Sequence, residues 1–208
     1  MENEISEKFM KKFIEDTFKL NDISGRPWIR TLYWWMIDST ERISQRLDIF
    51  LKNQIDNPNK ELAKVAKDMR KGTKNFDEVI INVLRYVDAR CTFISDEKNF
   101  GKVDYWANAY ETWCRCADDC DGQNALIYVL ASLAGIPYMN LWSVVGDTAN
   151  GYHYWNIYFS PKTSKWHSID STYYADLTDI DKRSLFKLGE KYKRIDFMFN
   201  ERFIWKQT

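Results

Sequence analysis

The chain has 208 residues, of which 45% are hydrophobic and 16% are aromatic, enough to bury one sizeable core. Its 30 basic and 30 acidic residues cancel, which argues against a nucleic-acid surface or an anionic-membrane anchor as the main function. The sequence has no apolar run near the roughly 20 residues that span a bilayer, and its charged start lacks the apolar region of a secretory signal. We therefore expect no membrane span, no signal peptide and a cytoplasmic location.

The first part of the chain predicts helices. Residues 4–20 carry apolar side chains along one helical face, and residues 28–55 continue a helical pattern up to the break at 57–59, Asn-Pro-Asn. We place an N-terminal helical extension at 1–58 and the main domain at 59–208. The apolar faces of the extension are core or a surface for a protein partner.

The next elements are two further helices, predicted over 62–69 and 76–86, with Asn75 or Thr73 capping the second. A polar loop is expected over 95–106. It leads into a cysteine-rich segment.

After Pro137 the hydrophobic period changes from helical to two, which predicts strands. The expected strands are 138–145, 153–159 and 166–170, joined by turns into an antiparallel meander. Two further segments are predicted to be a helix and a closing strand or pair of strands, at 176–192 and 194–205. Helices first and strands later indicate an α+β fold.

Cys120 stands directly before a predicted amphipathic helix that ends at Gly135 and Pro137. A thiol at a helix N-terminus lies at the positive end of the helix dipole, which favours the thiolate. The same position suits a structural buried cysteine. A nucleophile also needs a base and a residue that orients the base.

The chain has two histidines, His153 and His167. Strand alternation puts His153 on one face with Trp155 and Ile157, and we expect that apolar face to point toward the cysteine helix. His167 falls on the opposite face of its strand from Asp170. If His153 and Asp170 lie on adjacent strands, both can converge on Cys120.

These residues and their spacing resemble the transglutaminase-like superfamily, most closely its bacterial and phage cysteine proteinases. The matching positions are Asp104-Tyr105-Trp106, Glu111-Thr112-Trp113, Asp119-Cys120, Leu126, Gly135-Ile136-Pro137, His153 with Trp155, and Trp166 with Asp170 and Thr172. The resemblance covers roughly residues 60–175. It implies a papain-like, transglutaminase-like core in which a nucleophile helix packs on an antiparallel sheet.

The resemblance implies a Cys120-His153-Asp170 catalytic triad and thiol-dependent amide hydrolysis of a protein or peptide through an acyl-enzyme. Two alternatives stay open: transfer of the acyl group to an amine, which cross-links proteins, and a catalytically idle structural protein such as a phage virion component. A phage-encoded chain would be virion-associated. The Cys120 backbone N–H is one expected oxyanion donor, and the Trp106 indole is a candidate for another.

The chain departs from the family pattern around the nucleophile. Asp118 replaces a glycine, Gly122 and Asn124 replace the usual residues after the cysteine, and Tyr152 is inserted before His153. These changes leave the triad intact and alter the surroundings of the thiol and the substrate cleft.

A zinc site is the alternative use of the cysteines. Cys114, Cys116 and Cys120, with Cys91 or a histidine, offer enough ligands for Zn²⁺. The C-x-C-x₃-C spacing is unusual for zinc, and one short segment would have to supply three ligands. We expect no metal and no cofactor.

Overall fold

The computed structural model describes residues 6–25, 47–170, 172 and 177–207. Its helices are α1 Glu7–Phe18, α3 Leu47–Asp56, α4 Lys60–Arg70, α5 Phe76–Arg90, α6 Asp96–Phe100, α7 Ala109–Arg115, α8 Cys120–Leu133 and the short 3₁₀ helix η1 Ile180–Lys182. Its strands are β1 Leu20–Asp22, β2 Thr92–Phe93, β3 Ala117–Asp118, β4 Leu141–Thr148, β5 Gly151–Ser160, β6 Lys165–Ile169, β7 Tyr192–Phe199 and β8 Ile204–Gln207.

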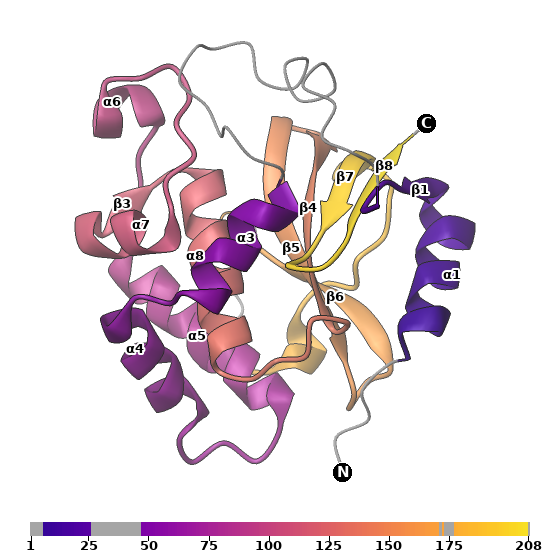
Figure 1. The fold of residues 1–208 in the computed structure, drawn as a ribbon, viewed down its shortest axis with the longest axis horizontal. Helices are drawn as coiled ribbons and strands as arrows, with labels where there is room; N and C mark the ends of the chain where they lie inside the picture. Colours follow the sequence, from indigo (N-terminus) through magenta and orange to yellow (C-terminus); the bar gives the residue numbers. More distant parts are fainter. Residues whose placement is uncertain (1–5, 26–46, 171, 173–176, 208) are drawn as a thin grey trace.

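The main sheet has six strands in the order β1-β8-β7-β4-β5-β6, and every neighbouring pair is antiparallel. Figure 1 shows this sheet between a group of helices that includes α8 and, on the far side, α1. The α+β prediction and the meander of β4, β5 and β6 are confirmed. The predicted closing pair is also confirmed, as the hairpin of β7 and β8.

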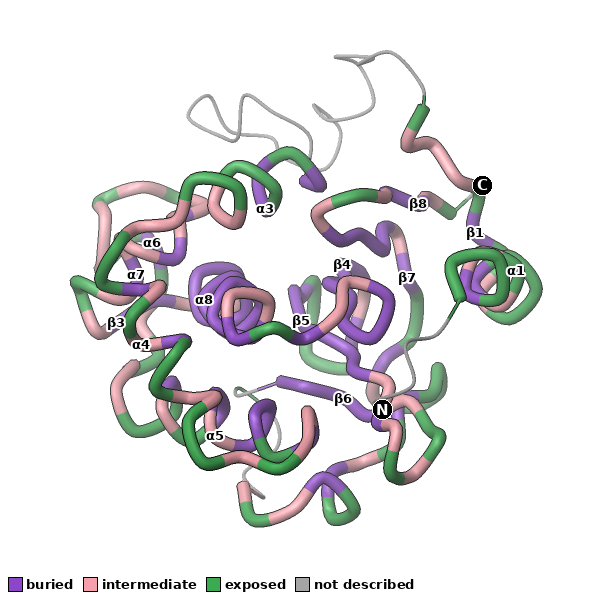
Figure 2. Tube along the Cα trace, turned by 60° about the horizontal axis from the view of Figure 1, so that its bottom comes forward, coloured by how far each residue is buried: buried purple, intermediate pink, exposed green. Residues whose placement is uncertain are grey.

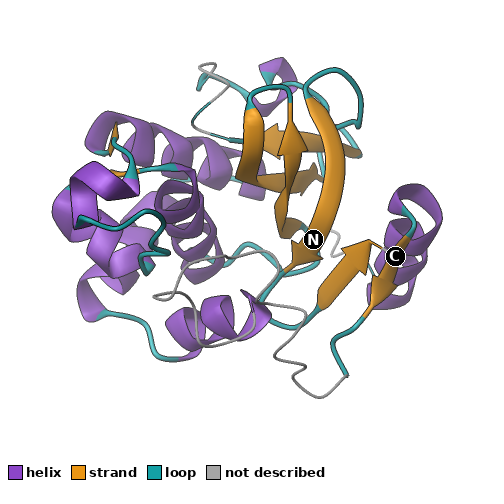
Figure 3. Ribbon diagram, turned by 90° about the horizontal axis from the view of Figure 1, so that it is seen from above, coloured by secondary structure: helices purple, strands orange, loops and turns teal. Residues whose placement is uncertain are grey.

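Each face of the sheet has its own apolar core. The larger core joins α8 to the β5 residues Tyr154 and Tyr158, and the smaller one joins Met10 of α1 to Trp155 and Ile157. In Figure 3 the sheet lies between a group of helices on one side and, on the other side, the helix near the C-terminus, which is α1. Because β5 alternates between two apolar environments, both of its faces are hydrophobic.

Helix α8 is the centre of the larger core and is not amphipathic, contrary to the sequence prediction. All residues from Asp121 to Ala131 are buried, as the tube in Figure 2 shows. Helices α3, α4, α5 and α7 surround it on the sides away from the sheet. Its polar first turn is buried because it meets the segment that carries α6 and β3.

The helix predictions in the first half of the chain are confirmed by α1, α3, α4 and α5 where those residues are described. Asn75 is the N-cap of α5 and accepts a hydrogen bond from the Glu78 N–H at 3.0 Å. The part of the predicted helical segment 28–55 that precedes Leu47 lies outside the described residues. Strand β1 was not predicted, because three residues carry no measurable period and the partner strand lies at the other end of the chain.

Two predictions of secondary structure were wrong. The segment 95–106, predicted to be a loop, contains α6, which begins after Ser95 and ends at Gly101 in a left-handed conformation. In the segment 176–192, predicted to be a helix, the described residues form a helix only at η1, and the last residue, Tyr192, begins β7. Main-chain bonds to β6 hold this second segment extended, including Ser168 N–H to Ser184 O at 3.0 Å and Phe186 N–H to Trp166 O at 2.9 Å.

Among the described helices, none is long and apolar enough to cross a membrane.

Candidate active site

A pocket of about 240 Å³ opens at the N-terminus of α8. Cys120 and His153 both line it, together with Trp106, Tyr152 and Tyr154. Four aspartates contribute to its wall: Asp96, Asp104, Asp119 and Asp121. The pocket therefore places a thiol and an imidazole in one water-accessible hollow with a strongly acidic side.

Local bonds fix the start of α8. Asp119 is its N-cap, and its side chain accepts the Asp121 N–H at 3.2 Å. The Asn124 amide donates to Cys120 O at 2.9 Å and to Tyr154 O at 2.8 Å. Asn124 thus ties the turn of α8 that carries Cys120 to β5, which gives a structural role to a residue that departs from the pattern the sequence resembles.

His153 and Asp170 are brought together, as predicted. His153 Nε2 lies 2.8 Å from Asp170 Oδ2, and both side chains are buried. The contact arises because β5 and β6 are adjacent antiparallel strands with Asn156 opposite Ile169. Asp170 Oδ1 accepts the Thr172 N–H at 3.0 Å, which fixes the carboxylate at the end of β6.

The expected direction of the His153 face was wrong. On β5, Tyr154 and Tyr158 pack in the core of α8, whereas Trp155, which shares the face of His153, packs in the core with α1. An apolar neighbour could not identify the helix-facing side, because α1 gives the other face a core as well. His153 still lines the pocket of Cys120.

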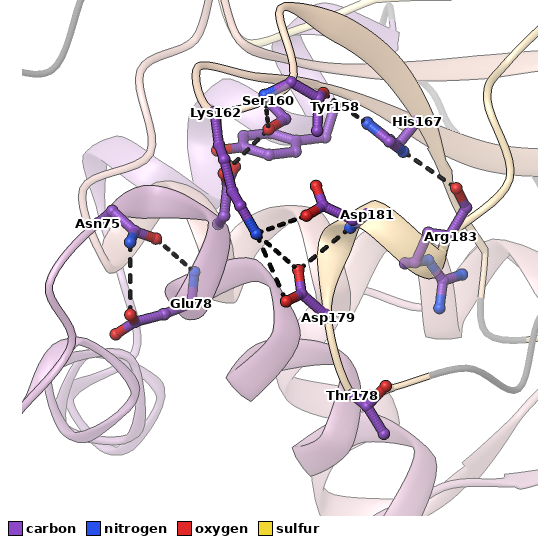
Figure 4. A network of polar contacts seen from close by, with 12 residues as sticks. Asn75, Glu78, Tyr158, Ser160, Lys162, His167, Thr178, Asp179, Asp181 and Arg183 are labelled. Atoms are coloured by element: carbon purple, nitrogen blue, oxygen red, sulfur yellow. Dashed lines mark hydrogen bonds and ion pairs between the residues drawn. The ribbon is translucent and has the colours of Figure 1, made fainter.

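His167 lies outside this pocket, in the polar network shown in Figure 4. Its Nε2 lies 2.8 Å from Thr163 Oγ1, and its Nδ1 donates to Arg183 O at 3.1 Å. One ring nitrogen therefore contacts the turn before β6, and the other contacts the segment after it. The sequence argument that set His167 aside agrees with this placement.

The surroundings of Cys120 disfavour the thiolate. Burial, followed by the carboxylates of Asp119 and Asp121, raises the pKa of Cys120 well above its ordinary value, and the Tyr154 backbone N–H lowers it in part. The helix-end argument predicted the opposite direction. Here desolvation and negative charge outweigh the helix dipole.

The acidic wall forms a compact cluster. Asp96, Asp118, Asp119 and Asp121 each offer an oxygen, and these oxygens lie within 4.8 Å of one another. Oδ1 of Asp96 and Oδ1 of Asp121 are buried and have no hydrogen-bond partner in the described part of the chain. Several carboxylate oxygens around one point are the ligand set of hard cations such as Ca²⁺, and the orphaned oxygens fit such an ion.

Without a cation, the carboxyl groups of the cluster bind protons more readily than ordinary aspartates do. Burial is the largest cause in each case: it raises the pKa of Asp96 to about 7 and that of Asp118 to about 6, and it raises the pKa of Asp121 well above its ordinary value. Sequence reasoning missed this cluster. The run Asp118-Asp119-Cys120-Asp121 was a visible signal, but Asp96 comes from α6, a helix that was not predicted.

The cysteines do not form the zinc arrangement considered above. Across the described residues, the one set of histidine, cysteine and acidic side chains close enough to hold a metal is the aspartate cluster. All four cysteines are free thiols.

Trp106 lies in the pocket wall, where the sequence placed a candidate oxyanion donor. Its ring stacks on Tyr154 with centroids 5.4 Å apart and packs edge-on against Phe50 of α3. Trp106 therefore also connects the pocket to the helices of the larger core.

Comparisons with known proteins bear on the fold. The sequence matches no protein-family model and no curated protein. Legionella pneumophila LapG, solved after EGTA treatment, has a similar structure with a TM-score of 0.53 and 15% identity, covering 80% of this chain and 87% of that one. A second LapG structure from the same organism gives 0.51 and 15%, covering 80% and 90%.

A solved TGase gives a TM-score of 0.40 at 15% identity, over 93% of this chain and 53% of the other. At such identities the comparisons concern the fold alone. The chain has a transglutaminase-like α+β fold, as the sequence predicted.

Proposed function

We propose that the protein is a thiol-dependent amide hydrolase that acts on a protein or peptide. Cys120 is the nucleophile, His153 is the base, and Asp170 orients the imidazole. The observation that carries this proposal is the 2.8 Å bond between His153 and Asp170 beside a pocket that His153 shares with Cys120.

The ring nitrogen that bonds to Asp170 decides which nitrogen of His153 is left to act as the base. Because Nε2 donates to the Asp170 carboxylate, Nδ1 is the nitrogen that would take the thiol proton. Burial keeps the thiol protonated, so the proton would leave as the sulfur attacks the amide carbon. His153 then protonates the departing amine, a thioester remains on Cys120, and water attacks that thioester with His153 again as base.

The tetrahedral intermediate needs donors for its oxyanion. The Cys120 backbone N–H, at the first turn of α8, is one proposed donor, and the Trp106 indole is the candidate for a second. Both residues line the same pocket.

The aspartate cluster would hold a divalent cation beside the nucleophile, with Asp96, Asp118, Asp119 and Asp121 as ligands. The ion would supply positive charge that offsets the carboxylates now raising the pKa of Cys120. The triad residues themselves are not part of the cluster.

A catalytically idle protein with the same fold is the second candidate. The raised pKa of the Cys120 thiol favours it, since an unactivated thiol is a poor nucleophile. Acyl transfer to an amine uses the same thioester, and only the acceptor distinguishes it from hydrolysis.

The test is a peptide-library digest in oxygen-18 water, followed by mass spectrometry, with calcium or with EDTA. Hydrolysis would place the heavy oxygen in new carboxyl termini, and an added primary amine would be incorporated instead if the protein transfers acyl groups. Cys120→Ala should abolish the reaction. Cys114→Ala, which removes an exposed thiol, should leave it unchanged. If Cys120→Ala and wild type give the same products, or neither gives any, the proposal fails.

A further inference from the structure

We propose that Tyr192 is a positioning residue for the triad: its hydroxyl holds the Asp170 carboxylate that in turn holds His153. The expected effect of Tyr192 on turnover rests on the proposed function. The effect of its hydroxyl on the His153 imidazole does not depend on any substrate.

Two donors converge on one carboxylate oxygen. The Tyr192 hydroxyl donates to Asp170 Oδ2 at 3.2 Å, and His153 Nε2 bonds the same oxygen at 2.8 Å. All three side chains are buried, with exposed fractions of 2% for Tyr192, 0% for Asp170 and 5% for His153. Hydrogen bonds to a charged group are strong in such an environment.

The backbone of Asp170 is held as well. The buried Arg183 side chain donates from Nη2 to Asp170 O at 3.2 Å and from Nε to Ser168 O at 3.1 Å. With the Thr172 N–H on Oδ1, the end of β6 is fixed by both main-chain and side-chain bonds. The Tyr192 hydroxyl reaches the same carboxylate oxygen that faces the imidazole.

Aromatic packing fixes the Tyr192 ring itself. Trp155 lies nearly parallel to His153, with centroids 6.0 Å apart, and it also packs against Tyr192, with centroids 4.7 Å apart, and against Phe186. Phe186 packs edge-on against Tyr192 at 5.6 Å. The rings therefore support both His153 and the hydroxyl that reaches Asp170.

The charged and titratable groups around His153 come from three directions. Asp170 follows β6, Tyr192 begins β7, and Cys120 and Asp119 approach from the start of α8. Of these, Tyr192 acts through Asp170. Removing its hydroxyl takes one donor from the carboxylate, which then stabilises the protonated imidazole more strongly.

The test is Tyr192→Phe, which removes the hydroxyl and keeps the ring that packs on Trp155. Side-chain NMR of the two histidines gives a direct readout, with His167 as the internal reference. We expect the resonance of the proton on His153 Nε2, which bonds to Asp170, to move downfield because the carboxylate that has lost one donor is a stronger acceptor, while the His167 resonances stay in place. In the hydrolysis assay, kcat should fall about tenfold with little change in KM.

Tyr158→Phe is the matched control. It also removes a buried hydroxyl that donates to a carboxylate, Asp77 Oδ1 at 2.8 Å, but on the opposite face of β5. It should leave the resonance of the His153 Nε2 proton unchanged. An unchanged His153 resonance in Tyr192→Phe would overturn the inference. A shifted resonance in a protein that hydrolyses nothing would uphold it and refute the proposed function.

Discussion

The Asp118 carboxylate occupies the space that a side chain at position 122 would need. A Cβ on Gly122 would lie 2.0 Å from Asp118 Oδ2 and 2.6 Å from Thr112 Oγ1. These two oxygens are bonded to each other at 2.6 Å. Two departures from the pattern that the sequence resembles are therefore one feature: Asp118 in β3 fills the space beside α8, and Gly122, four residues later, leaves room for it.

Gly122→Ala should therefore destabilise the fold. We expect a loss of about 1–3 kcal/mol in the free energy of unfolding, the usual range for overpacking a filled core, measured by chemical denaturation. Gly189→Ala, at a position with nothing within 4 Å of the added carbon, is the control and should be close to neutral. In the double variant Asp118→Gly/Gly122→Ala, the loss in the free energy of unfolding should be smaller than the sum of the losses in the two single variants. Losses that simply add would contradict a direct interaction between the two positions.

The aspartate cluster should bind a divalent cation and stabilise the fold. At a calcium concentration about 100 times the dissociation constant, binding to the folded state should add about 2.7 kcal/mol to the free energy of unfolding. For a chain of this size, that corresponds to a rise of about 5 to 10 °C in Tm. Asp121→Asn should remove the rise. Asp88→Asn, at an exposed position on α5, should keep it. If calcium, magnesium and EDTA all give the same Tm for the wild type, the cluster holds no such ion.

His167 should make stability depend on pH. Burial lowers its pKa below the ordinary value of 6.5, so the folded state binds fewer protons than the unfolded chain in that range. Its stabilising contribution is present above about pH 6.5 and is lost as the pH falls below it. The free energy of unfolding of wild type relative to His167→Gln should therefore shrink between about pH 7 and about pH 5. If the difference in the free energy of unfolding between the two proteins stays constant across this range, His167 is not the source of the pH dependence.

The order and type of the main elements could be predicted because their signals are local. Asn75, Gly135 and Pro137 mark helix ends, and the period-two pattern after Pro137 marks β4, β5 and β6. The pairing of His153 with Asp170 followed from adjacent strands, since both residues lie on one face of the meander.

The rest depended on long-range contacts. Both faces of β5 are apolar, so its pattern could not show which side meets α8. The cluster of aspartates needs Asp96, which reaches the start of α8 only through the fold. The hydrogen bond from Tyr192 to Asp170 also joins distant parts of the chain, because Tyr192 begins β7 near the C-terminus. No local sequence pattern marks it.

The most direct test of the central claim is the rate at which iodoacetamide alkylates each cysteine at neutral pH, resolved by peptide mass spectrometry and followed in calcium and in EDTA. Cys114 is exposed and serves as the reference thiol. The account predicts that Cys120 reacts faster than Cys114 in calcium and that His153→Ala lowers the Cys120 rate about tenfold or more while leaving the Cys114 rate unchanged. Equal rates for Cys120 in wild type and His153→Ala would contradict a Cys120–His153 catalytic pair.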